Sequence, residues 1–134
     1  LVEGGHLQTL SPGCTYFPPE GYCFELLSDE GVKKIGLVEA HARWKGWSPR
    51  EVLFQSALHA VGGGFKLAAM LLSGMSDRGV DTLVQLRDRG VATLAIDPSS
   101  SRVPILPACA VALGAVDVTI DLGLQPTTQS NYAS

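Results

Sequence analysis

The chain has 134 residues, which fits a single domain, because most domains contain about 100 to 200 residues. It is 46% hydrophobic and 17% charged with a net charge of −3, so it can bury a core and is too poor in charge to be disordered. Its ten Lys and Arg residues form no basic cluster, so we expect no nucleic-acid partner. Its longest apolar runs fall far short of the roughly 20 residues that span a bilayer, so we expect no membrane insertion.

Three cysteines, Cys14, Cys23 and Cys109, form neither an even disulfide framework nor a closely spaced zinc-binding pair. We therefore predict free thiols that pack as small hydrophobic side chains, and a reducing, cytoplasmic location. A pairing of Cys14 with Cys23 across a hairpin is the alternative. The first residue is Leu1 and not Met, from which we expect that the chain is a piece of a longer polypeptide.

The amino-terminal part of the sequence predicts a β-hairpin. Residues 14–17 and 22–27 are short aromatic or apolar runs on either side of residues 18–21, where two prolines fix φ and a glycine permits a turn. A third strand over residues 33–39 is expected after a second turn at 28–31.

A helix is predicted to begin after Ser48, where the apolar period changes. Ser48 stands at the N-cap, Pro49 at the first helical position and Glu51 at the capping-box position. Three glycines at 62–64 end this helix. The apolar run over residues 65–73 then predicts a central parallel strand that helices cover on both faces.

The rest of the chain alternates helices and strands. The predicted elements are a helix over 80–89, a strand over 91–96, a polar loop over 97–101, a short helix over 107–113 and a strand over 116–122. This alternation predicts a parallel sheet with right-handed crossovers, and such sheets bind ligands at the carboxyl ends of their strands. Loops 73–79 and 97–103 are therefore the candidate site, and residues 123–134 form a polar tail.

The segment after the predicted central strand resembles a known signature. Leu71-Leu72-Ser73-Gly74-Met75-Ser76-Asp77-Arg78-Gly79 is similar to the leucine-threonine-glycine-methionine-glycine-x-aspartate-glycine signature of chemotaxis protein-glutamate methylesterases. Four further segments resemble this family in the same order along the chain: residues 12–19, 51–56, 92–97 and 113–117. The resemblance covers roughly residues 2 to 122.

The resemblance implies an α/β fold, with a doubly wound, mostly parallel sheet in a flavodoxin- or Rossmann-like three-layer arrangement and an N-terminal β-hairpin. It implies a methylesterase-like domain over residues 1–122, followed by the tail over 123–134. Members of the family hydrolyse glutamate methyl esters on chemoreceptors with a serine nucleophile, a histidine base and an aspartate, without a cofactor. The chain begins after the positions of both the serine and the histidine, so we expect it to be inactive alone.

The resemblance also places the candidate active-site loop, which contains Gly74, Met75, Ser76, Asp77 and Gly79. Arg78 stands in the column of the family's aspartate, and Asp77 precedes it by one position. A carboxylate displaced by about 1 Å from its histidine can lose on the order of a hundredfold in rate. Asp77 is thus either the triad carboxylate of a rearranged loop or a cap of the helix that begins near Gly79.

Other interpretations of this loop remain open. Ser76, between a strand and a helix, loosely resembles the nucleophile elbow of α/β-hydrolases, although the spacing is one residue too long. Its hydroxyl could instead cap the helix, and the glycines could admit an anion at the helix N-terminus. A further alternative, which Arg78 suggests, is a catalytically degenerate module for receptor docking or self-association.

The three histidines, His6, His41 and His59, have no metal-ligand spacing, so we predict no metal site. His59 lies near the end of a predicted helix, where a structural role is expected. Trp44 and Trp47 are expected to pack on the core, and an exposed contact surface is the alternative.

A partner is also expected, besides the methylated chemoreceptor that the resemblance implies. A methylesterase domain without its first half would leave apolar strand surface and an open sheet edge. The missing N-terminal half as a separate chain, a second copy of this chain, or a rearranged sheet could cover them.

Overall fold

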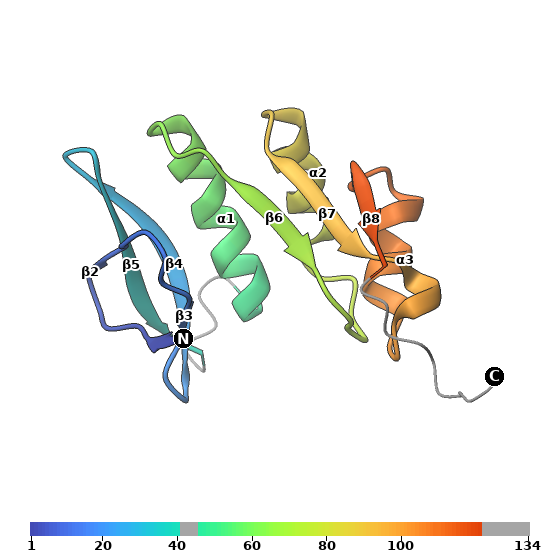
Figure 1. The fold of residues 1–134 in the computed structure, drawn as a ribbon, viewed down its shortest axis with the longest axis horizontal. Helices are drawn as coiled ribbons and strands as arrows, with labels where there is room; N and C mark the ends of the chain where they lie inside the picture. Colours follow the sequence, from blue (N-terminus) through green and yellow to red (C-terminus); the bar gives the residue numbers. More distant parts are fainter. Residues whose placement is uncertain (41–45, 122–134) are drawn as a thin grey trace. The chain divides into compact units, whose positions relative to one another are not determined.

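The computed structural model describes residues 1–40 and 46–121 (Figure 1). They fall into two compact units: unit 1 is Leu1–Leu67 and unit 2 begins at Ala68. A single domain over residues 1–122 stays a prediction, and the predicted tail over 123–134 lies outside the described residues. Within the described ranges no helix is long and apolar enough to cross a membrane.

The sheet of unit 1 is built on a hairpin of β4 (Tyr22–Asp29) and β5 (Val32–Glu39). Its two-residue turn, Glu30-Gly31, has φ values of 49° and 81°. A type I′ turn requires positive φ at both central residues, and its twist matches that of the flanking strands. The short strand β2 (Gln8–Thr9) pairs with the other edge of β5, so the strand order is β2-β5-β4.

The predicted hairpin of residues 14–17 and 22–27 is wrong. Strand β3 (Tyr16–Phe17) pairs in parallel with β1 (Val2–Glu3), and the partner of β4 is β5. The two prolines between β3 and β4 have no N–H for a ladder, whereas Glu30-Gly31 supplies a turn that a hairpin needs. The strand predicted over 33–39 is confirmed, as β5.

This correction also removes the alternative disulfide. Cys23 is buried and lies opposite Val38 on β5, whereas Cys14 is exposed outside the strands. Cys109 is half-buried, and all three cysteines are free thiols. The prediction that they pack as small hydrophobic side chains is wrong for Cys14, which is exposed.

Helix α1 (Pro49–Gly62) begins and ends as the sequence predicts. The Ser48 hydroxyl accepts from the Glu51 N–H at 3.3 Å, and the Glu51 carboxylate accepts from the Ser48 N–H at 2.8 Å, which completes the capping box. At the other end Gly64 has a φ of 94° and Phe65 donates its N–H to Ala60 C=O at 3.0 Å, a Schellman motif. Phe65 therefore belongs to the helix end and not to the strand that follows.

Unit 2 consists of three parallel strands and the segments that connect them. In chain order these are β6 (Ala68–Leu71), α2 (Val80–Asp88), β7 (Ala92–Ile96), the 3-10 turn η2 (Pro98–Ser100), α3 (Ile105–Ala112) and β8 (Val118–Ile120). The strand order is β6-β7-β8, so β7 is central and β6 lies at an edge of this sheet. The prediction of a long central strand over 65–73 is wrong, because Phe65 ends α1 and the strand stops at Leu71.

The two faces of this sheet differ in burial. Leu71 and Ala95 lie side by side in the register and are 3% and 0% exposed. Both crossovers run in the same direction, so α2 and α3 cover this one face, and Figure 1 shows both helices behind the strands. The row on the opposite face is Met70, Leu94 and Val118, of which Met70 is 41% and Val118 is 55% exposed.

Candidate functional site

The loops that follow β6 and β7 are joined at the carboxyl edge of the unit 2 sheet. Gly74 donates its N–H to Val103 C=O at 3.1 Å, and its own C=O accepts from Leu106 N–H at 2.9 Å. These two bonds hold loop 73–79 against residues 103–106. The two loops named from the sequence are therefore neighbours, at the edge where parallel α/β sheets bind ligands.

Loop 73–79 has its own hydrogen bonds. The Ser76 hydroxyl accepts from Arg78 N–H at 3.1 Å, and the Asp77 C=O accepts from Val80 N–H at 3.1 Å. Gly79, with a φ of 92°, is the N-cap of α2, and no side chain caps this helix. The prediction that Asp77 or Ser76 caps α2 is thus wrong, because glycine occupies the N-cap and the side chains of both residues precede it.

The nucleophile elbow is not formed either. An elbow places its serine on a sharp turn directly between a strand and a helix. Here β6 ends at Leu71 and α2 begins at Val80, and the hydroxyl of Ser76, midway between them, accepts a backbone hydrogen bond. Met75, next to it, is 78% exposed.

Three aspartates follow the three strands of unit 2, and they differ in their partners. Asp97 accepts hydrogen bonds from the Ser99 N–H at 3.0 Å and the Ser99 hydroxyl at 2.8 Å, and these bonds lower the pKa of the Asp97 carboxyl. Asp121 accepts from the Ser100 hydroxyl at 3.2 Å. The exposed Asp77 carboxylate has no hydrogen bond or ion pair with any described residue. Of the three, Asp77 is the one whose carboxylate makes no hydrogen bond to a described residue.

Sequence reasoning did not weigh Asp97 and Asp121 as competing carboxylates. The signal was present, because each follows an apolar strand whose carboxyl end meets the same sheet edge. Ser101 lies in the loop 97–103 that the sequence indicated, but the sequence does not show that its hydroxyl is buried without a hydrogen-bond partner among the described residues. Ser101 lies two residues before Val103, which binds Gly74.

Unit 2 supplies no histidine to the carboxyl edge of its own sheet, because all three histidines precede residue 68 in the sequence. His6 Nδ1 accepts from the Leu37 N–H of β5 at 3.0 Å, and His59 is exposed in the last turn of α1. His41 and Trp44 lie outside the described residues. In the part of the chain that the structure describes, no group of three or more His, Cys, Asp or Glu side chains could hold a metal ion.

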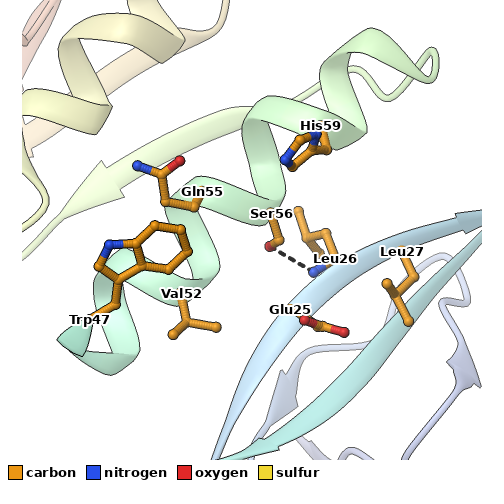
Figure 2. A pocket seen from close by; sticks show the side chains of 8 residues that line it. All are labelled: Glu25, Leu26, Leu27, Trp47, Val52, Gln55, Ser56 and His59. Atoms are coloured by element: carbon orange, nitrogen blue, oxygen red, sulfur yellow. Dashed lines mark hydrogen bonds between the residues drawn. The ribbon is translucent and has the colours of Figure 1, made fainter. Parts of the chain in front are cut away.

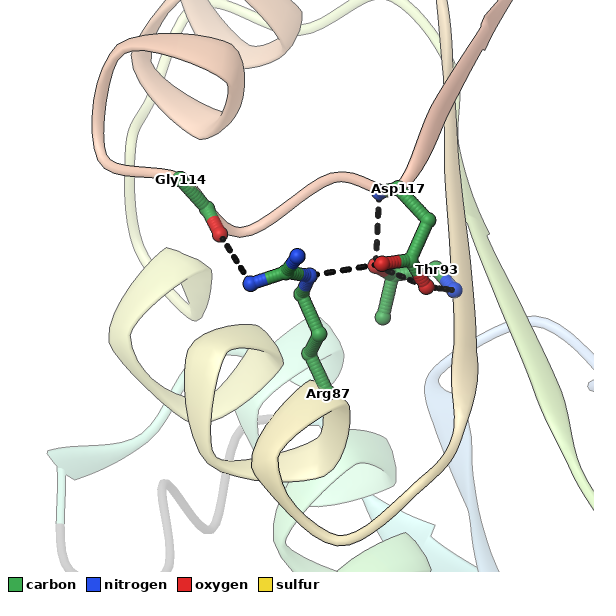
Figure 3. Close-up of polar contacts among 4 residues, drawn as sticks. All are labelled: Arg87, Thr93, Gly114 and Asp117. Carbon is green, nitrogen blue, oxygen red and sulfur yellow. Dashed lines mark hydrogen bonds and ion pairs between the residues drawn. The ribbon is translucent and has the colours of Figure 1, made fainter.

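A polar network at the amino ends of β7 and β8, opposite to the edge that carries these loops, joins the two strands to α2 (Figure 3). The Arg87 Nε donates to Asp117 Oδ1 at 2.6 Å, and Arg87 Nη1 donates to Gly114 C=O at 3.3 Å. The other Asp117 oxygen accepts from the N–H of the fully buried Thr93 at 3.1 Å. The bond from Arg87, followed by that from the Thr93 N–H, lowers the pKa of the Asp117 carboxyl. The network joins the end of α2 to β7 and to the start of β8.

Comparisons with known proteins agree with this geometry. A sequence model of the family described as CheB methylesterase matches residues 2–124. Protein-glutamate methylesterase/protein-glutamine glutaminase 2 of Saccharophagus degradans is 32% identical over 123 residues, which make up 91% of this chain and 34% of that protein. The protein-glutamate methylesterase/protein-glutamine glutaminase of Bordetella pertussis is 32% identical over 121 residues, which make up 90% and 34%. The chain thus spans about a third of the length of these relatives.

The fold has a solved counterpart. The Thermotoga maritima CheB methylesterase catalytic domain matches with a TM-score of 0.71 and 18% identity, over 89% of this chain and 62% of that one. This match confirms the predicted α/β fold class, and the family model covers nearly all of the described residues. The chain belongs to the CheB methylesterase family.

Proposed function

We propose that this chain is the part of a protein-glutamate methylesterase domain that supplies the triad carboxylate, and that it acts on methylated chemoreceptors. The relatives that it matches are named for this activity. The observation that carries the proposal is the free Asp77 carboxylate, on a loop that Gly74 fastens to the neighbouring loop at the carboxyl edge of the sheet. The expected compartment is the cytoplasm.

The chemistry needs groups from outside the chain. A serine hydroxyl attacks the ester carbonyl of the methylated glutamate, a histidine takes the hydroxyl proton, and methanol leaves. Water then hydrolyses the acyl-enzyme. In this scheme Asp77 accepts a hydrogen bond from the histidine, fixes its tautomer and stabilises the imidazolium. Serine and histidine come from the part of the family domain that has no counterpart here, so the isolated chain is inactive.

The apolar row of Met70, Leu94 and Val118, of which Met70 and Val118 are exposed and Leu94 is half-buried, supports a companion for this chain. An apolar face of a parallel sheet is normally covered by helices. We assign this face to the remaining part of the family domain, because the chain aligns with 62% of the solved catalytic domain. Gel filtration of the chain alone tests the assignment: a stable dimer that buries Met70 would favour a second copy instead.

The activity is tested by methanol release from a methylated receptor peptide. The chain is assayed alone and fused to the amino-terminal part of the Thermotoga maritima domain, with circular dichroism as the check of folding. We expect activity in the fusion alone, and a loss of about a thousandfold or more in Asp77→Asn, since a triad aspartate is worth up to about ten-thousandfold. Asp81→Asn, an exposed aspartate in the first turn of α2, is the matched control. Activity of the isolated chain, or equal effects of the two substitutions, would overturn the proposal.

A second candidate is a degenerate module for docking or self-association, and Arg78 favours it. Its guanidinium stands where the family has the aspartate and adds a positive charge beside the position of a catalytic imidazolium. Arg78→Asp in the same fusion separates the candidates. A large gain over an inactive fusion would support the degenerate module, whereas full activity of the unaltered fusion would exclude it.

A further inference from the structure

Unit 1 contains a pocket that none of the proposed esterase loops lines. It is formed between β4 and α1 and has a volume of about 330 Å³. Its lining residues are Glu25, Leu26, Leu27, Trp47, Val52, Gln55, Ser56 and His59 (Figure 2). Ligand pockets usually measure about 300 to 1,000 Å³, so this one suits a single side chain and not a large cofactor.

The walls of the pocket are fixed by a hydrogen bond between its two elements. Val52, Ser56 and His59 lie four and seven residues apart, and therefore on one face of α1. The Ser56 hydroxyl accepts from the Leu26 N–H at 2.8 Å, on the edge of β4 that faces away from β5 (Figure 2). The same hydroxyl donates to Leu53 C=O at 2.7 Å. Both hydrogen-bonding functions of Ser56 are thus used within the protein. The pocket is therefore preformed. Ser56 has no hydrogen-bonding function left for a ligand, so a polar ligand would need another group of the lining.

That group is the carboxylate of Glu25. The side chain is half-buried and has no hydrogen bond or ion pair with any described residue. Opposite it on β5 stands Gly36, where a Cβ atom would come within 3.1 Å of Glu25 Oε1, so the glycine leaves room for the carboxylate. The pKa of the neighbouring Cys23 thiol is raised mainly by burial and to a lesser extent by the negative charge of Glu25. A half-buried carboxylate without a counterion favours a cationic ligand.

Trp47 determines which cation fits. Its half-buried indole lines the pocket together with Val52 and Leu27. A guanidinium ion is planar, stacks on aromatic faces, is weakly hydrated and can bind a carboxylate through two parallel hydrogen bonds. An ammonium ion is a compact, strongly hydrated point charge that gains less from an apolar, aromatic wall.

We propose that this pocket binds an arginine side chain of a partner protein segment, with the guanidinium paired to Glu25 and stacked on Trp47. Its aliphatic stem packs on Leu27 and Val52. A segment within a protein is the source, because free arginine would bring its own carboxylate close to Glu25. His59 is the one side chain of the lining that could carry a compensating positive charge. The site uses none of the residues proposed for the esterase reaction.

The test is an NMR titration of the full chain with acetyl-Gly-Arg-Gly-amide. The readout is the indole N–H signal of Trp47, assigned with a Trp44→Phe variant. The matched ligand carries citrulline, which has the shape of arginine without the charge. We expect saturable binding of the arginine peptide, about tenfold or more tighter than that of the citrulline peptide, as for a lost charge-assisted pair. A lysine peptide and free arginine should both bind more weakly than the arginine peptide.

Variants of the protein locate the site. Glu25→Gln should weaken binding of the arginine peptide about tenfold, and Glu39→Gln, an exposed carboxylate at the end of β5 outside the pocket, should change it less than twofold. No saturable shift at Trp47, equal affinity for arginine and citrulline peptides, or equal effects of the two variants would overturn the site. Equal binding of the lysine peptide would overturn the choice of guanidinium, and equal binding of free arginine would overturn the choice of a protein segment. If Glu25→Gln does not fold, the citrulline comparison on the unaltered chain decides.

Discussion

Two glycines at the end of α1 allow the requirement for a left-handed backbone conformation to be tested with little change in side-chain packing. Gly62 is the last residue of the helix, and Gly64 follows the C-cap with a φ of 94°. A Cβ atom at either position would have no heavy atom within 4 Å. Alanine at the two sites therefore differs in backbone conformation and not in packing.

The expected changes have opposite signs. Gly62→Ala should raise the free energy of unfolding by about 0.5 kcal/mol, because alanine favours the helix and restricts the unfolded chain. Gly64→Ala should lower it by about 1 to 2 kcal/mol, the cost of a left-handed conformation for an L-residue. Gly64→Asn should lose less than Gly64→Ala, since asparagine visits this region more readily.

Urea unfolding monitored by tryptophan fluorescence measures this difference, because Trp47 stands just before α1. With a slope of about 1 to 3 kcal/mol per molar urea, the midpoints of the two alanine variants should lie about 1 M apart. Equal midpoints, or a Gly64→Ala protein that is the more stable of the two, would refute the assignment of a Schellman motif that depends on Gly64.

Two further predictions concern hydrogen bonds. Arg87 and Thr93 lower the pKa of Asp117 in the folded protein, so its contribution to stability is present above the unfolded pKa and is lost as the pH falls through the folded pKa. The urea midpoint of the wild type should therefore fall as the pH is lowered from about 5 to 3. Asp117→Asn should be less stable than the wild type at pH 7, and its midpoint should depend less on pH in that window. A wild-type pH dependence that Asp117→Asn leaves unchanged would contradict this. Ser56→Ala should speed hydrogen exchange of the Leu26 amide, because the Leu26 N–H loses its acceptor. The control Ser28→Ala should leave this exchange rate unchanged. If Ser56→Ala also leaves it unchanged, Ser56 does not hold the edge of β4.

The elements of unit 2 follow from local sequence rules. Helices α2 and α3 end as α1 does, with a glycine of positive φ, at Gly90 and Gly114. In each case the next residue donates its N–H back into the helix, Val91 to Leu86 at 3.1 Å and Ala115 to Ala110 at 2.9 Å. Apolar periodicity and glycines that end helices are local signals, so the helices and strands of unit 2 could be predicted to within a few residues.

The pairing of the strands was harder to predict than the elements themselves, because it depends on partners distant in the sequence. Residues 14–17 have the composition of a strand but pair with β1, and the strand predicted over 65–73 loses Phe65 to the end of α1. The candidate site shows the same limit. The sequence indicated loop 73–79, whereas the hydrogen bonds that distinguish Asp97 and Asp121 from Asp77 appear in the structure. The bonds of Asp97 come from its near neighbour Ser99, and that of Asp121 comes from Ser100, 21 residues away.

The scaffold and the proposed activity rest on different residues. Glycine-terminated helices and the Arg87–Asp117–Thr93 network arrange the strands of unit 2, and none of these residues is part of the proposed triad. The proposed activity depends on the exposed loop around Asp77, which is bonded to residues 103–106 through the backbone of Gly74. The two Gly74 bonds do not involve the side chain of residue 78, and Arg78 is exposed, so we expect its substitution to cost the fold little. Arg78→Asp should therefore leave the unfolding transition where it was, and any change in methanol release by the fusion then reports on the reaction and not on folding.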